Sequence, residues 1–359
     1  MKILIVTGSS GGHIFPALAL IESLKTCPGL EALLVLPKRS SIKTEGVAVR
    51  YLATTPIGLR INIRNIIGVF NLLKGSLQSL FLLLEYRPDV VVGFGTIDSV
   101  PLVVLAWLSR VKTLIHEQNV IPGRATRFLA LFSDRVAVSF PETLDYLKAS
   151  SDKIAITGNP LRSSIKAVNR KEALDFFGFD ETGFTILVSG GSQASHGLNM
   201  IFSNSVAVFE AGVKLQVIHI CGAKDYSFME ESYRKFSGKV KLFRFLDEMH
   251  YAYSASELVI GRAGATSIAE IIYFAKPAIL VPYPYAYRHQ SENAKLLSQA
   301  RCAVIIEEEA GAEERLREQL LTLISAPEEL KTMCSNFEGF TKGNAGENLA
   351  RETVGLGKN

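Results

Sequence analysis

Short apolar runs rich in β-branched residues alternate along the whole chain with longer stretches of mixed apolar and polar residues. Consecutive apolar positions are typical of parallel strands that are buried on both faces, with helices in the crossovers between them. The pattern predicts strands at the following positions: Ile3–Val6, Ala32–Leu36, Val90–Val92, Thr113–Ile115, Arg135–Val138, Lys153–Ile156, Phe184–Val188, Leu215–Ile220, Val240–Phe243, Leu258–Ile260, Ala278–Val281 and Ala303–Ile305.

The alternation is interrupted once, near the middle of the chain. Gly158, Asn159 and Pro160 follow a predicted strand, and a new alternation of helices and strands begins after them. The predicted strands are too numerous for an eight-stranded α/β barrel. The sequence therefore predicts two doubly wound, Rossmann-like α/β domains that face each other across a cleft. They are expected at residues 1–160 and 161–359, with the last helix able to pack back on the N-terminal domain.

The composition supports two folded domains. The chain has 359 residues, of which 48% are apolar, and this is enough to fill two sizeable cores. Four cysteines lie far apart, with no CxxC pair and no adjacent histidine, so we expect no zinc site, no disulfide framework and a reducing compartment. The net charge is +4, but residues 1–160 hold 17 Lys/Arg against 11 Asp/Glu, and residues 161–359 hold 22 against 24.

No segment is predicted to cross a membrane or to act as a signal peptide. The stretch Val90–Leu108 is long and apolar, but Asp98, Pro101 and two glycines divide it into a strand, a polar turn and a buried helix. The apolar run at the start of the sequence is short and is followed by glycines and His13 rather than by a longer apolar core.

The first predicted strand leads into a glycine-rich loop, Gly8–His13. Glycines let the backbone approach a ligand closely, and the helix that follows presents N–H groups to an anion. The loop lacks the GK[ST] of a P-loop and the GxGxxG of a dinucleotide site. Pro16 fits the first turn of the helix. His13, at the start of that helix, is our candidate general base or acceptor-orienting group. A tight turn without a ligand is the alternative.

Polar or glycine-rich loops follow several other predicted strands: Gly93–Asp98, His116–Asn119, Ser189–Gln193, Gly261–Glu270 and Arg288–Asn293. The carboxyl ends of parallel strands are the common ligand-binding edge of such sheets, so the loops predict a nucleotide bearing phosphates. Glu270 could accept hydrogen bonds from a ribose diol, or be an ordinary solvated or capping group. Because no acidic pair such as DxD lies near these loops, we expect no metal, no cofactor and phosphate neutralisation by helix dipoles and Arg162.

In their order and spacing, the blocks GGHIFPALA, HEQN with PGR, TGNPLR, GGSQ, RAGATSIAE and HQSENA resemble the MurG family, from Met1 to about Leu297. The resemblance implies a GT-B glycosyltransferase that binds its acceptor in the N-terminal domain and its donor in the C-terminal one. The implied reaction belongs to peptidoglycan synthesis: inverting transfer of GlcNAc from UDP-GlcNAc to the 4-hydroxyl of MurNAc in lipid I, with UDP leaving.

The resemblance also implies residues that contact the donor: Ser10, Gly11, Gly12, Asn119, Arg162, Ser192, Leu246, Ala265, Thr266, Ser267, Ile268, Ala269, Glu270, Gln290 and Asn293. Arg162 and Ser192 are implied to contact the pyrophosphate, and Leu246 to hold uracil through its backbone. Residues Ala265 to Ala269 would cradle phosphate, and Glu270 would bind ribose.

Gln290, with Asn293 behind it, is implied to contact the GlcNAc hydroxyls, and the second loop is implied to contact the acceptor through Gly93, Gly95 and Thr96. Three loops depart from the family pattern. The first reads GSSGGH rather than GGTGGH, the second has Gly95-Thr-Ile where GGY is usual, and GGSQ is followed by Ala194-Ser-His rather than Gly-Ala-Arg.

Other readings stay open for such a chain. A GT-B transferase that uses another lipid acceptor, such as diacylglycerol, is favoured by the altered second loop. A nucleotide-sugar epimerase has the same architecture, and a non-catalytic nucleotide-sugar-binding protein is the alternative from a different class. Presence of His13, Asn119, Glu270 and Gln290 together argues against the non-catalytic reading.

A lipid acceptor would explain the excess of basic residues in the N-terminal half, because such a surface can bind a membrane. Between Lys38 and Arg87 there are eight Lys/Arg and two Glu, interleaved with apolar residues: Ile57, Leu59, Ile61, Ile63, Ile66, Ile67, Val69, Phe70, Leu72 and Leu73. A basic and apolar surface of this kind can bind an anionic leaflet, whereas a core helix with a solvated cationic face is the alternative. We expect a peripheral protein on the cytoplasmic face of the bacterial inner membrane, with no nucleic-acid partner.

Overall fold

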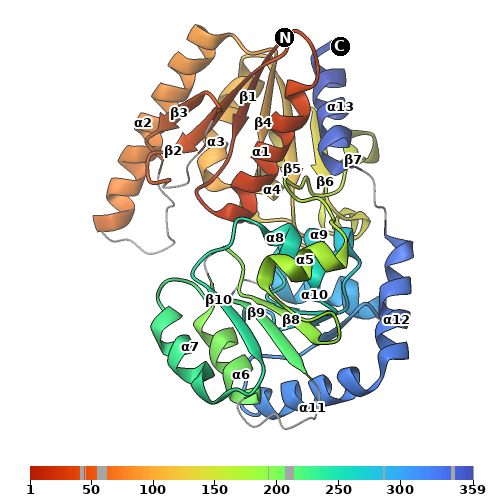
Figure 1. The fold of residues 1–359 in the computed structure, drawn as a ribbon. Coiled ribbons are helices and arrows are strands. Elements are labelled where there is room, and N and C mark those ends of the chain that lie inside the picture. The colour runs from red at the N-terminus through yellow and green to blue at the C-terminus, as the bar shows by residue number, and fades with distance from the viewer. Residues whose placement is uncertain are drawn as a thin grey trace. The chain divides into compact units, whose positions relative to one another are not determined.

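The fold is known from a computed structural model, which describes residues 1–40, 44, 46–54, 63–192, 194–206, 214–285, 288–340 and 344–358; of residues 63–67, 69 and 235 it describes the backbone alone. The chain forms two compact units (Figure 1). The first comprises Met1–Arg162 with Gly343–Asn359, and the second comprises Ser163–Lys342.

The described part of the first unit contains a seven-stranded parallel sheet with the strand order β3-β2-β1-β4-β5-β6-β7. Its strands are β1 (Lys2–Val6), β2 (Glu31–Pro37), β3 (Val49–Leu52), β4 (Val90–Gly93), β5 (Lys112–Glu117), β6 (Arg135–Val138) and β7 (Ile154–Ile156). Its helices are α1 (Gly11–Lys25), α2 (Ile63–Tyr86), α3 (Val100–Leu108), α4 (Arg124–Leu129) and α13 (Ala345–Lys358).

Both faces of this sheet are buried, as the consecutive apolar runs predict. Ile3 and Ile5 point into a core shared with α1 and α13, whereas Leu4 and Val6 point into a core on the opposite face, shared with α3. The last helix, α13, follows the second unit along the chain but contributes Leu349 to the core of the first.

The described part of the second unit contains a six-stranded parallel sheet with the order β10-β9-β8-β11-β12-β13. Its strands are β8 (Phe184–Ser189), β9 (Leu215–Ile220), β10 (Lys239–Phe243), β11 (Leu258–Gly261), β12 (Ala278–Leu280) and β13 (Ala303–Ile305). Its helices are α5 (Arg170–Phe177), α6 (His196–Val206), α7 (Tyr226–Ser232), α8 (Met249–Ala255), α9 (Ala265–Phe274), α10 (His289–Gln299), α11 (Ala312–Ser325) and α12 (Pro327–Ser335).

The strand order reverses at β1 in the first sheet and at β8 in the second. In open parallel sheets this switch point leaves a crevice beyond the carboxyl ends of the strands, where ligands bind. The loops after β1 and β4, and those after β8 and β11, start at neighbouring positions, because Val6 pairs with Gly93 and Ser189 with Gly261. The fold therefore places the predicted functional loops at the switch points.

The predicted fold class is confirmed, and two details of the prediction were wrong. The first sheet has an additional edge strand, β3, which the pattern missed because Arg50 and Tyr51 within it are exposed. Helix α1 begins at Gly11, so Pro16 lies in its second turn rather than its first. Of the apolar residues expected at a membrane surface, Ile57, Leu59 and Ile61 lie outside the described residues.

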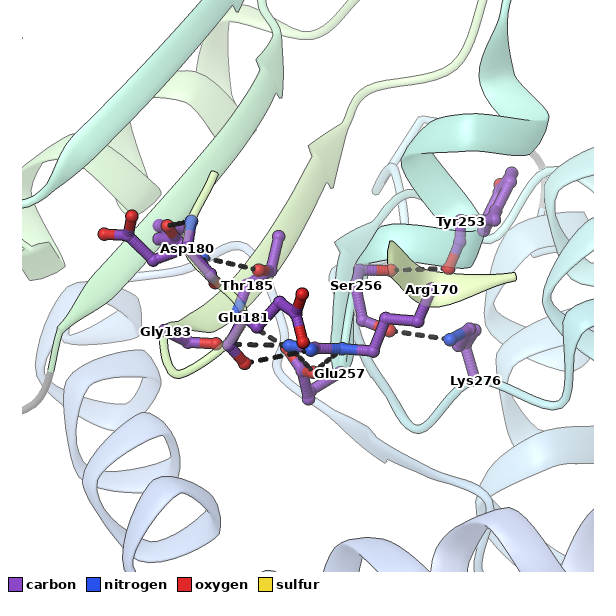
Figure 2. A network of polar contacts seen from close by, with 10 residues as sticks. Arg170, Asp180, Glu181, Gly183, Thr185, Tyr253, Ser256, Glu257 and Lys276 are labelled. Carbon is purple, nitrogen blue, oxygen red and sulfur yellow. Dashed lines mark hydrogen bonds and ion pairs between the residues drawn. The ribbon is translucent and has the colours of Figure 1, made fainter. Parts of the chain in front are cut away.

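A polar network closes the amino-terminal edge of the second sheet (Figure 2). Arg170 Nε donates to Glu257 Oε1 at 2.6 Å, and Glu257 Oε2 accepts from the backbone N–H of Thr185, in β8, at 2.7 Å. Lys276, just before β12, donates through Nζ to the carbonyl of Ser256 at 2.7 Å. Burial raises the pKa of Glu257 and lowers that of Lys276. The network ties together the segments that precede β8, β11 and β12.

Among the described residues, every helix is too short or too polar to span a bilayer.

Candidate functional site

The first functional loop leads from β1 into α1. Ser10 occupies the N-cap position with an extended backbone, but its side chain makes no capping hydrogen bond. Gly12 is exposed, and a Cβ added there would meet nothing within 4 Å, so the space above this turn is open. His13 lies in the first turn of α1 with a half-buried ring. The loop thus presents a helix N-terminus and an imidazole at the same edge.

The ring of His13 belongs to a chain of hydrogen bonds that reaches into the loops after β5 and β7. His13 Nδ1 lies 2.7 Å from Gln118 Oε1. Gln118 Nε2 lies 2.9 Å from the carbonyl oxygen of His116 and 3.0 Å from its Nδ1. His116 Nε2 lies 3.0 Å from the carbonyl oxygen of Gly158. Neither His116 nor Gln118 was among the predicted site residues.

The two histidines joined by these hydrogen bonds, His13 and His116, are held in the neutral form. Burial lowers the pKa of His13 below its usual 6.5, although the carboxylate of Glu117, Gln118, the carboxylate of Asp98 and the Phe94 carbonyl act in the opposite direction. Burial lowers the pKa of His116 to about 4. A neutral imidazole can accept a proton, which is the property a general base needs.

Glu117 shapes the loop that follows β5. Its side chain is buried, with Oε1 accepting from the backbone N–H and the Nδ2 of Asn119 at 2.9 and 3.1 Å. Its Oε2 accepts from the backbone N–H of Gly123 at 3.0 Å. One carboxylate thereby fixes the turn that carries Asn119, so Glu117 has a positioning role in the HEQN motif.

The second loop, after β4, packs tightly on its neighbours. Gly95 has a φ of +63°, and a Cβ there would collide with the hydroxyl of Thr126 in α4, so this position requires glycine. Within the described residues, the buried hydroxyl oxygens of Thr96 and Thr126 have no hydrogen-bond partner. Asp98 is buried and accepts two hydrogen bonds from the Arg39 guanidinium, at 3.0 and 2.5 Å.

The TGNPLR segment ends at Arg162, where the chain leaves the first unit for the second. The Arg162 guanidinium lies over the ring of Phe15, 4.4 Å from its centroid, next to the residues that begin α1. Asn159 is 6% exposed, and neither polar atom of its side chain has a partner among the described residues. An unpaired buried amide is costly and is a feature of sites that bind a ligand. The prediction did not include Asn159, although the motif contains it.

In the second unit, a buried arginine holds several loops together. Arg262 follows β11, is 4% exposed, and donates from Nε and Nη2 to Ser195 Oγ at 2.9 and 2.5 Å. Its Nη1 donates to the carbonyl of Val281 after β12 at 2.9 Å, and its Nη2 pairs with Glu308 after β13. A charge in this position can be buried because every side of it is paired.

Helix α9 begins at Ala265, three residues after the buried Arg262. Gly264 is its N-cap and has no side chain to cap the first turn, and a Cβ there would meet nothing within 4 Å. An uncapped helix N-terminus beside open space suits an anion. Farther along α9, Glu270 is 9% exposed, and its Oε2 accepts from the Tyr253 hydroxyl at 2.9 Å.

The remaining predicted residues of this unit lie on the same edge. Gln290 Oε1 accepts from the backbone N–H groups of Tyr283 at 2.9 Å and Ala263 at 3.3 Å, while Asn293 Nδ2 donates to the carbonyl of Ala263 at 3.0 Å. They therefore hold the loop after β11 against the start of α10.

Leu246 is buried in the loop after β10, and Ser192 is exposed in the turn after β8. Gln193 of the GGSQ block lies outside the described residues. His196, where the chain departs from the family pattern, begins α6, and its Nδ1 lies 3.1 Å from Asp225 Oδ1.

The structure therefore brings the predicted residues together in two groups, one at the carboxyl edge of each sheet. It adds residues that the sequence reasoning missed, chiefly Gln118, His116 and Arg262. The polar run 116–119 signalled the first two, and the three glutamates at 307–309, after a strand, were a signal for a buried arginine partner. The described residues contain no group of three or more His, Cys, Asp or Glu side chains arranged to hold a metal ion.

Two family models match the chain, one in each half of the sequence. The N-terminal domain of glycosyltransferase family 28 matches residues 3–138, and the C-terminal domain of the same family matches residues 185–349.

Curated relatives extend over nearly the whole chain. A protein of Thermodesulfovibrio yellowstonii, named UDP-N-acetylglucosamine--N-acetylmuramyl-(pentapeptide) pyrophosphoryl-undecaprenol N-acetylglucosamine transferase, is 34% identical over an alignment of 368 residues that covers 97% of each protein. A protein of Halothermothrix orenii with the same name is 36% identical and covers 95% of each.

Among solved structures, MurG of Acinetobacter baumannii matches with a TM-score of 0.78 at 24% identity, covering 99% of this chain and 100% of that one. This likeness shows a shared GT-B fold. Together with the two family models and the curated relatives, it identifies the chain as a member of glycosyltransferase family 28 and, within it, of the MurG family.

Proposed function

We propose that this protein transfers GlcNAc from UDP-GlcNAc to the 4-hydroxyl of MurNAc in lipid I, which gives lipid II for peptidoglycan synthesis. The observation that carries this proposal is the match, over 95% or more of the chain, to relatives named for that donor and that acceptor. The second unit supplies a donor edge and the first unit an acceptor edge, each at the carboxyl ends of its strands.

The donor edge fits a nucleoside diphosphate sugar. The uncapped N-terminus of α9, formed by residues 265–269, can hold phosphate, and Glu270 beside it can accept hydrogen bonds from the ribose hydroxyls. Leu246 would hold uracil through its backbone. Ser192 and Arg162 would contact the pyrophosphate. Nε2 of Gln290, whose Oε1 is already bonded to backbone N–H groups, can donate to a GlcNAc hydroxyl, with Asn293 behind it.

His13 is the general base in this proposal. The 4-hydroxyl of MurNAc attacks C1 of GlcNAc, His13 accepts its proton, and UDP leaves from the opposite face of the sugar, so the configuration inverts. Ser10, Gly11, Gly12 and Asn119 would approach the GlcNAc moiety. The helix dipole of α9 stabilises the negative charge that develops on the departing diphosphate, and positioning supplies most of the remaining acceleration.

The acceptor would bind at the second loop of the first unit, at Gly93, Gly95 and Thr96. The unpaired buried hydroxyls of Thr96 and Thr126 support this assignment, since a sugar hydroxyl can satisfy both a donor and an acceptor.

The first unit also has a surface that suits a membrane. On α2, exposed apolar side chains recur at helical spacing: Phe70, Leu73, Leu77, Phe81 and Leu84. Helix α3 packs beside α2 and exposes Trp107 and Leu108. Exposed Lys74 lies on α2, and exposed Arg87 and Arg110 follow the ends of α2 and α3. We propose that this surface binds the anionic cytoplasmic leaflet of the bacterial inner membrane, where the lipid acceptor resides.

Transfer of radiolabelled GlcNAc tests the reaction directly. The protein is incubated with UDP-[14C]GlcNAc and lipid I, with diacylglycerol, or with no acceptor, and the lipid fraction is counted. Label that enters the lipid with lipid I alone is the expected result. Transfer to diacylglycerol instead would show that the acceptor is diacylglycerol and not lipid I. Absence of transfer in all three incubations would show that the proposed activity is wrong.

Sedimentation with vesicles tests the membrane surface. We expect binding to vesicles that contain phosphatidylglycerol, weaker binding in high salt, and a further loss when Phe81 and Leu84 are replaced by serine. The matched control is replacement of Phe176 and Phe228, two exposed aromatic residues of the second unit. Equal binding by both double variants would place the membrane surface elsewhere.

A further inference from the structure

The hydrogen bonds between His13, Gln118 and His116 fix where the protons lie. Gln118 Nε2 faces the carbonyl oxygen of His116 at 2.9 Å, and a carbonyl can only accept, so the amide nitrogen must occupy this side. The amide oxygen of Gln118 therefore faces His13 Nδ1 at 2.7 Å, and Nδ1 of His13 must carry the hydrogen.

The contacts at the other end of this series of hydrogen bonds agree with that assignment. Gln118 Nε2 also donates to His116 Nδ1 at 3.0 Å, so this ring nitrogen is unprotonated. The remaining nitrogen, Nε2, then carries the hydrogen and donates to the carbonyl of Gly158 at 3.0 Å, which again can only accept. No member of the chain can be turned round without placing two acceptors or two donors face to face.

We propose that Gln118 is a positioning residue for the transfer reaction: supported by His116 and the Gly158 carbonyl, it holds neutral His13 in the tautomer protonated at Nδ1 and leaves the lone pair on Nε2 to accept the proton of the attacking hydroxyl. The kinetic part of this inference rests on the proposed function. The tautomer itself does not, because it follows from the contacts within the first unit.

The tautomer matters because it is the less stable one for histidine free in water, where the proton prefers Nε2. A base with its lone pair on the wrong nitrogen, or pointing in the wrong direction, cannot take the proton, and in other enzymes this tautomer choice is set by the group bonded to the second ring nitrogen. Gln118 is 1% exposed and His116 is fully buried, so neither exchanges its partner for water.

Charged groups near His13 do not make this choice. The carboxylates of Glu117 and Asp98 favour a protonated ring through their charge, and the hydrogen bonds of the ring to Gln118 and to the Phe94 backbone carbonyl do so as well, against the desolvation that lowers the pKa of His13. The hydrogen bond of the ring to another side chain, within the described residues, is made at Nδ1. The two carboxylates and the Phe94 carbonyl therefore affect how readily His13 takes a proton, and the amide oxygen of Gln118 is the acceptor that holds the hydrogen on Nδ1.

The chain also joins three loops that are distant in sequence. His13 follows β1, Gln118 follows β5, and Gly158 follows β7, so the base is supported by the edge of the sheet rather than by its own helix alone. A substitution at Gln118 is expected to act on His13 at a distance from the reacting atoms.

Nitrogen NMR of the histidine rings tests the tautomer without using activity. The protein is labelled with [15N]histidine, the signals of His13 and His116 are identified from His13→Ala and His116→Ala, and long-range 1H–15N spectra are recorded at pH 8. We expect wild-type His13 with the hydrogen on Nδ1 and His116 with the hydrogen on Nε2. Wild-type His13 found with its hydrogen on Nε2 would overturn the proposal.

Two substitutions at position 118 sharpen the test. In Gln118→Leu, His13 loses its acceptor, so its hydrogen should move predominantly to Nε2 and kcat should fall about tenfold to 10²-fold with little change in the KM for UDP-GlcNAc. In Gln118→Glu, a carboxylate can still accept from Nδ1, so the tautomer should persist. The added negative charge should raise the pKa of His13 and shift the acidic limb of the pH–kcat profile upward.

The matched control is Gln216→Leu in the second unit. Gln216 is likewise buried and makes three hydrogen bonds, to both backbone groups of Asp180 and to Thr185 Oγ1 (its neighbours appear in Figure 2). Its replacement should lower the melting temperature as Gln118→Leu does, but leave the His13 tautomer and the pH profile unchanged. If Gln216→Leu moves them equally, the effect of Gln118 is general loss of stability and the positioning role is wrong.

The outcomes separate this inference from the proposed function. If the tautomers are as expected but wild-type protein transfers no GlcNAc to lipid I, the proposed function fails and the tautomer assignment stands. If transfer occurs and Gln118→Leu moves the tautomer without lowering kcat, the positioning role fails and the proposed function stands.

Discussion

The carboxyl edges of the two sheets have the same strand order around their switch points but differ in the chemical groups that form them. In the first unit, the edge is formed by side chains that are hydrogen-bonded one to the next, from His13 through Gln118 and His116 to the Gly158 carbonyl. In the second, it is formed by backbone N–H groups at α9 and by loops tied to the single guanidinium of Arg262. The same fold thus offers one edge suited to proton transfer and another suited to binding.

The largest effect is expected from His13, which represents the reactive edge. Replacing it with alanine should lower kcat by about 10²–10⁴-fold, the usual contribution of a general base, and leave the KM for UDP-GlcNAc nearly unchanged. Steady-state kinetics with lipid I measures both parameters. His196→Ala is the control, because that histidine is exposed on the second unit. A kcat near that of wild type in His13→Ala would assign the base to another group.

The second prediction contrasts opposite edges of one sheet. Arg262→Met leaves Glu308 and several loop groups without their buried partner and should cost about 3–5 kcal/mol of unfolding free energy and weaken UDP binding. Arg170→Met removes the more exposed pair with Glu257 at the amino edge in Figure 2, so it should cost less and leave UDP binding intact. Urea unfolding and calorimetric titration with UDP distinguish them. If the two variants lost the same UDP affinity, the proposed difference between the carboxyl and amino edges of the sheet would be wrong.

The third prediction concerns Glu270 and the binding edge. Glu270→Ala should weaken UDP-GlcNAc binding by about tenfold to 10²-fold, the value of a hydrogen bond to a charged group, while kcat at saturating donor changes little. The variant Tyr253→Phe removes the hydroxyl that donates to Glu270 and serves as the control for local packing. Donor affinity that is the same in Glu270→Ala and wild type would show that the ribose binds elsewhere.

The smallest effect is expected from pH, and here the two units should behave alike. Burial lowers the pKa of His116 in the first unit to about 4 and that of His219 in the second to about 3. The unfolded chain binds protons at these residues near the usual 6.5, so their stabilisation is present above that pH and is lost as the pH falls toward the folded values. Between pH 7 and pH 5, each histidine should cost its unit about 2 kcal/mol.

Hydrogen exchange followed separately in the two units measures that loss. If one unit kept its stability at pH 5, its buried histidine would have to be charged in the folded protein.

The sheets were predictable because their strands are buried on both faces. All six residues of Leu215–Ile220 are buried, and the predicted strand matches the observed one at both ends even though Gln216 and His219 interrupt its apolar residues. The edge strand Val49–Leu52 escaped prediction because its two central residues, Arg50 and Tyr51, are exposed, so its sequence has no continuous apolar run.

The functional loops were also predictable in position, since each follows a strand of a parallel sheet. Their internal contacts were not. Nothing in the local sequence says that His116 hydrogen-bonds to Gly158, or that Arg262 reaches Ser195 and Glu308, because these pairs meet through the fold rather than along the chain. The resemblance to a family named the residues expected to contact the ligand, whereas the structure added those that hold them in place.

The placement of α13 has a consequence for how the protein is made. This helix, Ala345–Lys358, supplies Leu349 and Ala350 to the apolar core that also contains Ile3, Ile5 and Leu20. The ribosome must therefore translate the whole second unit before the core of the first can close. Domains usually fold in the order of their synthesis. Here the unit that is begun first is completed last, and until then its nascent core presents apolar surface to chaperones.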